Sequence, residues 1–374
     1  MIYITLSSYK TEIKMFQRQF FPKKSQIGLC DEALRFNECL INHKYNICEK
    51  IISENAESDR LYWNRMQKRI SHILERKKQY KIRGKKPPIY IYWHGFWSDM
   101  NTEDCQILDF LKESMQDEVL IRTNKAKKAD IFICSCLGEE ITSKRFDHCL
   151  KIIFLGENIR PYYRNYDLSL TSDLNEYRGR NINLPLWLLE IDLFNRNKKY
   201  DDRETQNIDL FCNASSIDFS KRESGIVYIG NNEEPFRQSL IYDLSKEFKS
   251  FHTYGSQTNP IKDKINFLKK YKGSLAFENS FYPGYVTEKI IHTYLAGNMT
   301  IYWGCLKGSI IKKNPLFFEV NTTTDIKEII SKAEYIIKNN ETINIPPLFE
   351  KKIILKKKEN IIKKLNLSLK QFSL

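Results

Sequence analysis

Six polar side chains that can hold an anion or move a proton lie close together, within residues 278–289. One of them, Lys289, falls in the first turn of a predicted helix, where a cation opposes the helix dipole. A phosphate bound by the free backbone N–H groups of the helix start would resolve that conflict. The cluster therefore predicts a site for a phosphate-bearing ligand, and its members are Glu278, Asn279, Tyr285, Thr287, Glu288 and Lys289.

A strand–loop–helix–strand unit must position these side chains. Residues 274–277 form a short apolar run of the length of a buried strand. Thr287 can cap a helix that ends near Gly297, and residues 299–303 return to a strand-like pattern. This succession is typical of a parallel α/β sheet, in which ligands bind at the carboxyl ends of the strands.

The same stretch carries a long family motif. The sequence FENSFYPGYVTEKI at residues 277–290, followed by IYWG at residues 301–304, closely resembles the signature of the α-1,3/4-fucosyltransferases. These are inverting enzymes of the two-domain GT-B type that use GDP-fucose. The resemblance implies that the donor is bound by Asn231, Arg237, Tyr254, Glu278, Asn279, Tyr285, Val286, Thr287 and Lys289.

The resemblance also implies a catalytic pair. An apolar strand at residues 151–155 runs into Gly-Glu-Asn, and the Glu of this pattern, here Glu157, is the expected general base. Glu288 is expected to stabilise the oxocarbenium-like sugar or to bind the ribose hydroxyls; the alternative is an ordinary acidic residue favoured by the helix dipole. His94 is a reserve base, or else a structural histidine.

Aromatic side chains near the first strand could bind an acceptor sugar. Trp93, His94 and Trp97 follow or end the apolar run at residues 89–93, and Trp93 and Trp97 offer flat faces for stacking. Single aromatic residues are more often part of a core, so both interpretations stay open.

Two positions depart from the family pattern. Gly230 stands where the family has Ser, which removes one hydroxyl contact to the donor but lets the backbone approach a ligand closely. Cys305 follows the IYWG motif where the family usually continues with Asp or Ser. These changes predict a donor pocket that is shaped differently on its flanks.

The length of 374 residues suits two domains. We expect an α/β fold of the GT-B type, in which two Rossmann-like domains with parallel sheets face a cleft. The alternative for the predicted linker is a surface loop inside one domain. The expected segments are a helical extension (1–86), an acceptor domain (87–196), a linker (197–207), a GDP-fucose-binding domain (208–348) and a basic amphipathic helix (349–374).

The net charge of +14 requires an anionic partner, and its location limits the choice. The basic runs lie at residues 76–86 and 351–374, outside the recognised domains, so we expect no nucleic acid partner. The first run could grip a phosphate backbone but is more often a solvated helix end. The second forms an amphipathic helix, which either contacts an anionic membrane or packs on the N-terminal domain.

Metal, disulfide and membrane signals are weak. Nine cysteines are scattered, and those at positions 30, 39 and 48 would point to opposite sides of a helix. No Asp-x-Asp motif occurs, so we expect no cofactor, with a divalent metal at most stimulatory. No apolar run reaches the roughly 18 residues of a membrane span, and the N-terminus does not resemble a signal peptide. We therefore expect a cytoplasmic protein, with peripheral membrane contact through its tail.

Together the motifs predict an inverting glycosyltransferase. It would move L-fucose from GDP-fucose to a hydroxyl of N-acetylglucosamine in a lactosamine-type oligosaccharide or glycolipid, most simply in α-1,3 linkage. The setting would be surface polysaccharide, such as lipopolysaccharide with Lewis-type antigens, or other glycan synthesis. The alternatives are a transferase using another GDP-sugar, a non-catalytic glycan-binding protein and a nucleic-acid-binding protein.

Overall fold

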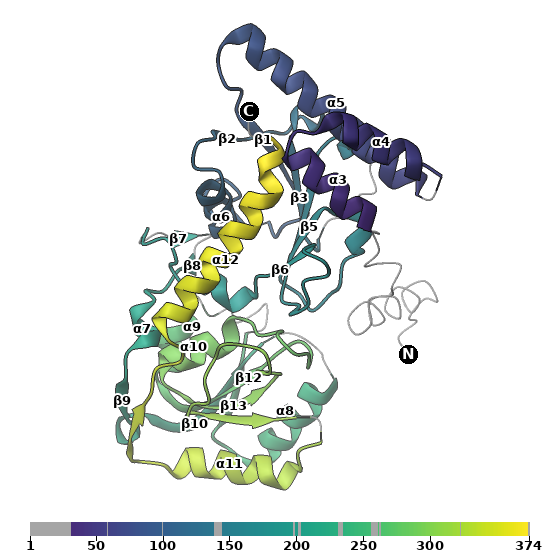
Figure 1. Ribbon diagram of the computed structural model, residues 1–374. Coiled ribbons are helices and arrows are strands. Elements are labelled where there is room, and N and C mark those ends of the chain that lie inside the picture. Colours follow the sequence, from purple (N-terminus) through teal and green to yellow (C-terminus); the bar gives the residue numbers. More distant parts are fainter. Residues whose placement is uncertain are drawn as a thin grey trace. The chain divides into compact units, whose positions relative to one another are not determined.

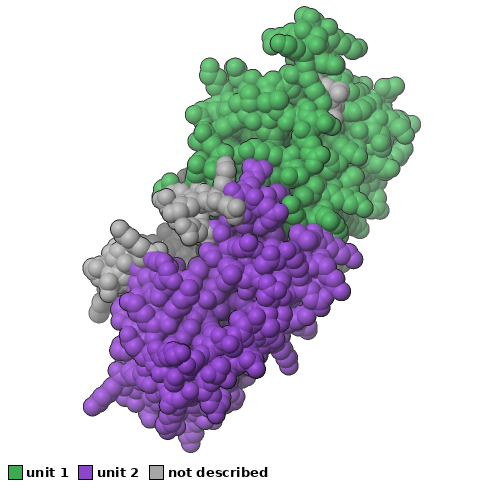
Figure 2. All heavy atoms as spheres, turned by 90° about the vertical axis from the view of Figure 1, so that its left-hand side faces the viewer, with its two compact units in different colours: residues 1–184, 199–203, 358–374 green, residues 185–198, 204–357 purple. Residues whose placement is uncertain are grey.

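The computed structural model describes residues 31–57, 59–98, 100–137, 144–196, 199–200, 203–230, 235–255, 261, 263–321 and 323–372 (Figure 1). The chain forms two compact units, which Figure 2 colours separately. Unit 1 comprises residues 1–184, 199–203 and 358–374; unit 2 comprises residues 185–198 and 204–357. Among the described residues, no helix combines the length and the hydropathy that a membrane span needs.

Unit 1 contains a six-stranded sheet in the order β2-β1-β3-β4-β5-β6, and every neighbouring pair is parallel. The central strands β3 and β4 are buried along their whole length, which explains their nearly continuous apolar sequences. The strands are β1 Ile89–His94, β2 Leu120–Arg122, β3 Ile131–Cys134, β4 Leu150–Leu155, β5 Leu168–Thr171 and β6 Asn181–Asn183.

The helices of unit 1 include a long one that precedes the sheet. Asp59 caps α5, because its carboxylate accepts the N–H of Tyr62, and Gly84 ends the helix in a left-handed conformation. The helices are α3 Asp31–Ile41, α4 Tyr45–Asn55, α5 Arg60–Arg83 and α6 Gln106–Ser114, and short 3₁₀ turns span Ala126–Lys128, Lys144–Phe146 and Tyr163–Asn165.

The helix α5 is an integral part of unit 1 and not an accessory extension. Arg69 is completely buried and pairs with Asp167 at 2.5 Å. Arg76, which the sequence placed in a solvated or phosphate-binding basic run, pairs with the buried Asp130 at 2.8 Å. Both interpretations of that run were therefore wrong for Arg76, because its charge neutralises a carboxylate at the start of β3.

Unit 2 contains a five-stranded parallel sheet in the order β11-β10-β12-β13-β14. Helices α9 and α10 lie on one side of it and α11 on the other (Figure 1). The sheet strands are β10 Glu223–Ile229, β11 Phe251–Tyr254, β12 Tyr271–Phe277, β13 Met299–Trp303 and β14 Phe317–Val320. The helices are α7 Asp209–Cys212, α8 Pro235–Glu247, α9 Lys264–Leu268, α10 Glu288–Ala296 and α11 Ile326–Lys338.

Two short strand pairs and two 3₁₀ turns were not predicted. The strand β9 Ser215–Asp218 pairs antiparallel with β15 Thr342–Ile345, 124 to 130 residues apart in the sequence, a pairing that no local pattern announces. The other pair joins β7 Lys199–Tyr200 and β8 Arg203–Glu204. The turns span Leu186–Glu190 and Phe219–Lys221.

The chain leaves unit 1 earlier than the predicted border at residue 196. Residues 185–198 belong to unit 2. The turn Leu186–Glu190 packs on α10, where Glu190 Oε2 lies 3.1 Å from His292 Nε2. Trp187 is buried against Phe349. The sequence prediction placed the domain border at the Lys- and Asp-rich segment after residue 196. The true border lies earlier, because the side chains just before that segment already pack within unit 2.

The C-terminal helix α12 Lys351–Leu369 buries the apolar stripe that the sequence indicated. Ile354, Ile361, Leu365 and Leu369 are all at most 2% exposed. Asn366 donates a hydrogen bond to the Ser114 carbonyl at the end of α6, at 2.5 Å. A final 3₁₀ turn, Lys370–Phe372, follows. Two roles were predicted for this helix, membrane contact and packing within the protein. The apolar stripe has the second role, because it is buried in the protein.

Candidate functional site

A cavity of about 200 Å³ opens at the carboxyl ends of β10 and β12 in unit 2. Four of the residues predicted to bind the donor or to act in catalysis line it: Arg237, Asn279, Glu288 and Lys289. They come from α8, from the segment after β12 and from the first turn of α10. This is the sheet edge at which open α/β folds bind ligands.

Arg237 is 1% exposed and is held by three oxygen atoms. It donates to the Tyr228 hydroxyl at 2.6 Å, to Asn279 Oδ1 at 3.0 Å and to the Glu278 carbonyl at 3.3 Å. These bonds fix both the guanidinium and the amide of Asn279 at the cavity wall. A fixed, planar cation of this kind suits a phosphate, since its rotational freedom is already lost before binding.

Glu278 does not face the cavity as predicted. Its side chain is completely buried, and its carboxylate accepts the N–H of Thr287 at 2.9 Å, the Thr287 hydroxyl at 2.6 Å and the Tyr302 hydroxyl at 3.2 Å. Glu278 therefore supports the start of α10, and a direct contact of this side chain with the ligand stays a prediction. Burial raises the pKa of Glu278, while Lys289 and Thr287 act in the opposite direction.

Side chains of the protein itself balance the positive charge of Lys289, which opposes the dipole of α10. Lys289 Nζ lies 3.6 Å from Glu278, 3.8 Å from Glu288 and 3.0 Å from Thr287 Oγ1. The helix-start N–H of Thr287 is likewise taken by Glu278. Lys289 therefore does not require a bound phosphate to balance its charge. Its side chain is half-buried at the cavity wall, where a phosphate could still reach it.

Glu288 carries a negative charge at neutral pH. Burial alone would raise its pKa, but the neighbouring side chains of Lys289, His292 and Lys264 outweigh burial and lower the pKa of Glu288 to about 2. A carboxylate that is ionised at this position can stabilise positive charge in the cavity.

Sequence reasoning missed two cavity residues, Lys264 of α9 and His292 of α10. His292 follows Glu288 by four residues, so helical spacing could have placed both on one face. The His292 ring also contacts Glu190 of the turn Leu186–Glu190, as described above. No motif marks Lys264, the first residue of the short helix α9.

Four further predicted donor residues, Tyr254, Tyr285, Val286 and Thr287, do not line the cavity. Tyr285 and Val286 are at most 1% exposed, inside the turn before α10. Thr287, equally buried, is the residue before α10, but its side chain bonds Glu278 and not the helix backbone. Tyr254 is half-buried at the end of β11, with its hydroxyl 3.3 Å from that of Tyr271. Asn231 lies outside the described residues.

Two glycines leave room for the tyrosines that hold this site together. A Cβ added to Gly230 would lie 2.4 Å from the Tyr228 hydroxyl, which binds Arg237. A Cβ added to Gly304 would lie 2.4 Å from the Tyr302 hydroxyl, which binds Glu278. The departure from the family pattern at Gly230 thus accompanies a buried tyrosine–arginine contact that a serine would crowd.

In unit 1, Glu157 follows the carboxyl end of β4 and is half-buried. Its neighbour Asn158 accepts a hydrogen bond from Arg160 at 2.9 Å, and Arg160 pairs with Asp173 at 2.7 Å. Asp173 also accepts the Tyr177 hydroxyl at 2.6 Å. This buried network fixes the loop that carries Glu157.

The three predicted acceptor-binding residues lie at the same sheet edge: Trp93 and His94 end β1, and Trp97 follows it. Trp93 packs edge-on to Phe96 at 5.3 Å, and Trp97 packs edge-on to Phe154 at 6.4 Å. His94 ends β1 beside β3 and stacks on Phe132. All three predicted side chains are half-buried, so each shows part of its surface.

Within the part of the chain that the structure describes, no three His, Cys, Asp or Glu side chains are grouped as metal ligands would be. The charged side chains at the cavity wall are the cations Arg237, Lys264 and Lys289 and the carboxylate Glu288. The arrangement can hold an anionic group between cations, with one carboxylate close by.

Comparison with known proteins agrees with this geometry. The sequence profile of the alpha-(1,3)-fucosyltransferase FucT N-terminal domain matches residues 91–190. The profile of the glycosyltransferase family 10 (fucosyltransferase) C-terminal domain matches residues 219–344. The two profiles cover the sheets of unit 1 and unit 2, respectively, and together more than half of the chain.

Individual relatives carry fucosyltransferase names. The chain is 25% identical over 280 residues to alpha-(1,3)-fucosyltransferase FucT of Helicobacter pylori, covering 67% of this chain but only 57% of that protein. It is 26% identical over 157 residues to 4-galactosyl-N-acetylglucosaminide 3-alpha-L-fucosyltransferase 9 of Mus musculus, covering 37% of this chain and 44% of that protein.

A crystal structure of alpha1,3-fucosyltransferase has the same fold. It superposes with a TM-score of 0.50 at 20% identity, over 75% of this chain and 92% of that one. This likeness confirms the predicted GT-B type of α/β fold with parallel sheets. With both profiles matched in order along the chain, the protein belongs to the fucosyltransferases of glycosyltransferase family 10.

Proposed function

We propose that this protein transfers L-fucose from GDP-fucose to a hydroxyl of N-acetylglucosamine in a lactosamine-type glycan, forming an α-1,3 linkage with inversion. Family membership supports the reaction type, and the names of the H. pylori and mouse relatives support the linkage. The observation that carries the proposal is the cavity of unit 2, in which Arg237 and Lys289 lie with the ionised Glu288.

Each charged group has a task in this reaction. The diphosphate gains negative charge as the sugar bond breaks, and the fixed cations Arg237 and Lys289 would stabilise that charge in the transition state. Glu288 would stabilise the oxocarbenium-like fucose. The cations make a metal ion unnecessary in this proposal.

Glu157 would act as the general base. The acceptor hydroxyl must lose a proton as it attacks the sugar, and a positioned carboxylate contributes roughly 10²–10⁴ in rate. Its loop is held by Asn158 and Arg160, which keeps the carboxylate in a defined place. Trp93 and Trp97, at the same edge of the sheet, would provide faces for the acceptor sugar.

A donor and acceptor panel tests the proposal. Purified protein is incubated with GDP-fucose or GDP-mannose and with lacto- and neolacto-type tetrasaccharides, and the product linkage is read by NMR. We expect fucose transfer to the neolacto-type acceptor only, and a Glu157→Gln variant that binds GDP normally but loses at least about 10²-fold in rate. Preferred use of GDP-mannose, or wild-type turnover by the variant, would contradict the proposal.

The setting of the reaction stays a prediction. Synthesis of surface polysaccharide and a cytoplasmic location, with the basic helix α12 at a membrane face, would fit the exposed lysines Lys352, Lys356 and Lys363. The acceptor panel does not depend on that setting.

A further inference from the structure

A second and larger groove, of about 1000 Å³, lies in unit 1 along α5. Its other wall is formed by residues that precede or begin β4 and β5, among them Asp147, Lys151 and Asn165. It therefore lies at the amino edge of the sheet, whereas Glu157 follows the carboxyl end of β4. The six residues of β4 separate the two edges by about 20 Å.

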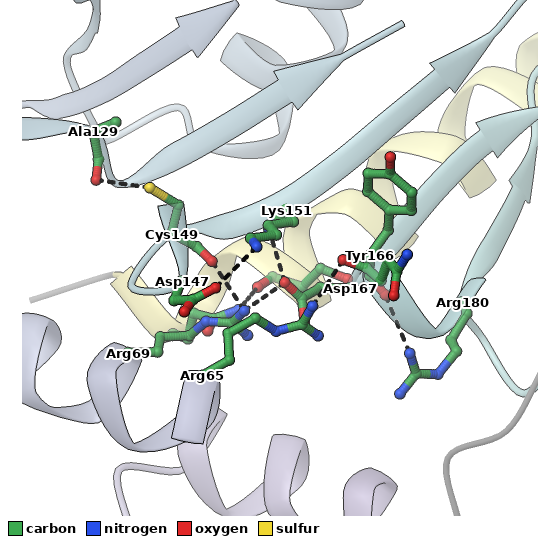
Figure 3. Close-up of polar contacts among 12 residues, drawn as sticks. Arg65, Arg69, Ala129, Asp147, Cys149, Lys151, Tyr166, Asp167 and Arg180 are labelled. Atoms are coloured by element: carbon green, nitrogen blue, oxygen red, sulfur yellow. Dashed lines mark hydrogen bonds and ion pairs between the residues drawn. The ribbon is translucent and has the colours of Figure 1, made fainter. Parts of the chain in front are cut away.

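The groove has a surplus of positive charge at its base. Among the described residues around Asp167, the two carboxylates Asp147 and Asp167 pair with four of five cations. Lys68 and Lys151 both pair with Asp147, at 2.9 and 3.2 Å, while Arg65 and Arg69 reach from α5 toward Asp167 (Figure 3). The fifth cation, Arg180, donates only to backbone carbonyls, at 3.1 and 3.2 Å.

Several donors in this cluster lack acceptors. Arg65 is 6% exposed and lines the groove. Its Nη1 donates to the Asn165 carbonyl at 2.7 Å and its Nη2 lies 3.5 Å from Asp167, whereas its Nε has no hydrogen-bond acceptor within the described residues. The same holds for Nε and Nη1 of the fully buried Arg69. Burial lowers the pKa of Lys151, and the charge of Arg65 lowers it further. Buried cations that outnumber their partners in this way favour an anion in the adjoining groove.

The remaining lining describes what kind of anion fits. Amide and hydroxyl groups of Asn64, Gln67 and Ser71 on α5 face this groove, and such groups form hydrogen bonds with sugar hydroxyls. The volume reaches the upper end of the range for small-molecule pockets, about 300–1,000 Å³, which suits an extended ligand. Tyr62, the aromatic residue of the lining, is 4% exposed, so it offers no face on which nucleic acid bases could stack.

We propose that this groove binds an oligosaccharide that carries phosphate or carboxylate groups, and thereby holds an acidic acceptor chain at a distance from the reacting sugar. The saccharide nature of the ligand rests on the proposed function, whereas the preference for an anion rests on the groove itself. The exposed Lys68 and Lys144 and the partly exposed Arg164, at the rim of the groove, would contact the acidic groups.

Calorimetric binding to the full chain tests this proposal. The probes are a pentamannose phosphate, a glucuronate-containing hexasaccharide, neutral lacto-N-neotetraose and a uridine oligonucleotide. The variant Lys68→Gln/Lys144→Gln removes two rim charges. Its matched control, Lys78→Gln/Lys81→Gln, removes two exposed charges from α5 away from the groove.

We expect one of the two acidic saccharides to bind with clearly higher affinity than the neutral one. Comparing the affinities of the two acidic saccharides identifies phosphate or carboxylate as the recognised group. The groove variant should bind it at least tenfold more weakly, and the control within twofold. Equal losses in both variants, equal binding of the neutral saccharide, tighter binding of the oligonucleotide or no binding at all would overturn the proposal.

The fucose-transfer assay separates this proposal from the previous one. Absence of transfer to every acceptor, with acidic saccharide binding retained, would refute the proposed reaction alone. Transfer to neutral acceptors by a protein whose groove binds no acidic saccharide would refute the groove proposal alone.

Discussion

The carboxylate of Glu278 lies 3.6 Å from Lys289 Nζ, and its other oxygen accepts the N–H of Thr287. One buried side chain at the end of β12 thus fixes both the start of α10 and the cation that faces the cavity. Glu278 is a positioning residue in this arrangement, since it reaches the ligand only through Thr287 and Lys289.

The substitution Glu278→Gln should lower fucose transfer with little loss of stability. The neutral amide no longer holds Lys289 by charge, so we expect kcat/KM for GDP-fucose to fall roughly 10- to 100-fold, about 1.4–2.7 kcal/mol. The unfolding temperature should change little, because the substitution also removes the cost of burying a carboxylate. The control is Glu319→Gln on the exposed side of β14. Unchanged donor KM and turnover in Glu278→Gln would refute the positioning role.

Loss of the Tyr228 hydroxyl should weaken the donor site through Arg237. Tyr228→Phe removes a 2.6 Å bond to a buried guanidinium, which is worth about 1.5–3 kcal/mol, so we expect GDP to bind roughly tenfold or more weakly. Gly230→Ala should act in the same direction by displacing the Tyr228 ring. Tyr242→Phe, on the exposed face of α8, is the matched control. Titration calorimetry with GDP measures all three, and wild-type affinity in Tyr228→Phe would contradict the contact.

Acid should destabilise unit 1 through Asp167. Burial alone would raise its pKa, but Arg69 and Arg65 lower it from 3.8 to about 2. A carboxyl group whose pKa is lowered by folding stabilises the folded state at pH values above its ordinary pKa. This stability is lost as the pH falls from about 4 through about 2. We expect this group alone to account for about 2 kcal/mol of that loss.

Urea unfolding at several pH values between about 5 and 2 measures this effect. Asp167→Asn should cost about 3–5 kcal/mol near neutral pH, because two buried arginines lose their partner, and should show a smaller further loss in acid. Asp117→Asn, at an exposed position, should follow the wild-type profile. An unchanged acid profile in Asp167→Asn would rule out the ion pairs as its source.

Substitutions of two leucines in α12 distinguish packing within the protein from contact with a membrane. Leu365 is completely buried and Leu367 is 47% exposed. Leu365→Ala should destabilise the fold by about 2–5 kcal/mol, whereas Leu367→Ala should change stability by less than about 0.5 kcal/mol. Equal effects in thermal unfolding would mean that the stripe does not pack as described. Flotation with anionic vesicles then shows whether Leu367→Ala reduces membrane binding.

The elements that the sequence predicted well are those with local signals. The helix after Thr287 ends at the left-handed Gly297, as predicted, although the Thr287 side chain does not cap it. The apolar strands β1, β4, β12 and β13 follow from short buried runs. The family motif and the strand–helix pattern around it also predicted four lining residues of the donor cavity.

The features that the sequence concealed depend on distant partners. Arg69 and Asp167 are 98 residues apart, so the local sequence of α5 does not indicate that Arg69 is buried. Glu278 looks like a polar residue in a ligand loop, and only the packing of Tyr302 and Thr287 around it shows that it is enclosed. Whether a charged side chain is buried depends on residues far away in the sequence, and the periodicity of a helix or strand does not reveal those residues.

The return of α12 to unit 1 has a consequence for synthesis of the chain. Unit 2 is nearly contiguous, and all of its residues have been translated once position 357 is reached. Unit 1 is different, because residues 358–372 belong to it and bury Ile361, Leu365 and Leu369 there. During translation unit 1 therefore stays incomplete until unit 2 has been synthesised and the last segment of unit 1 emerges.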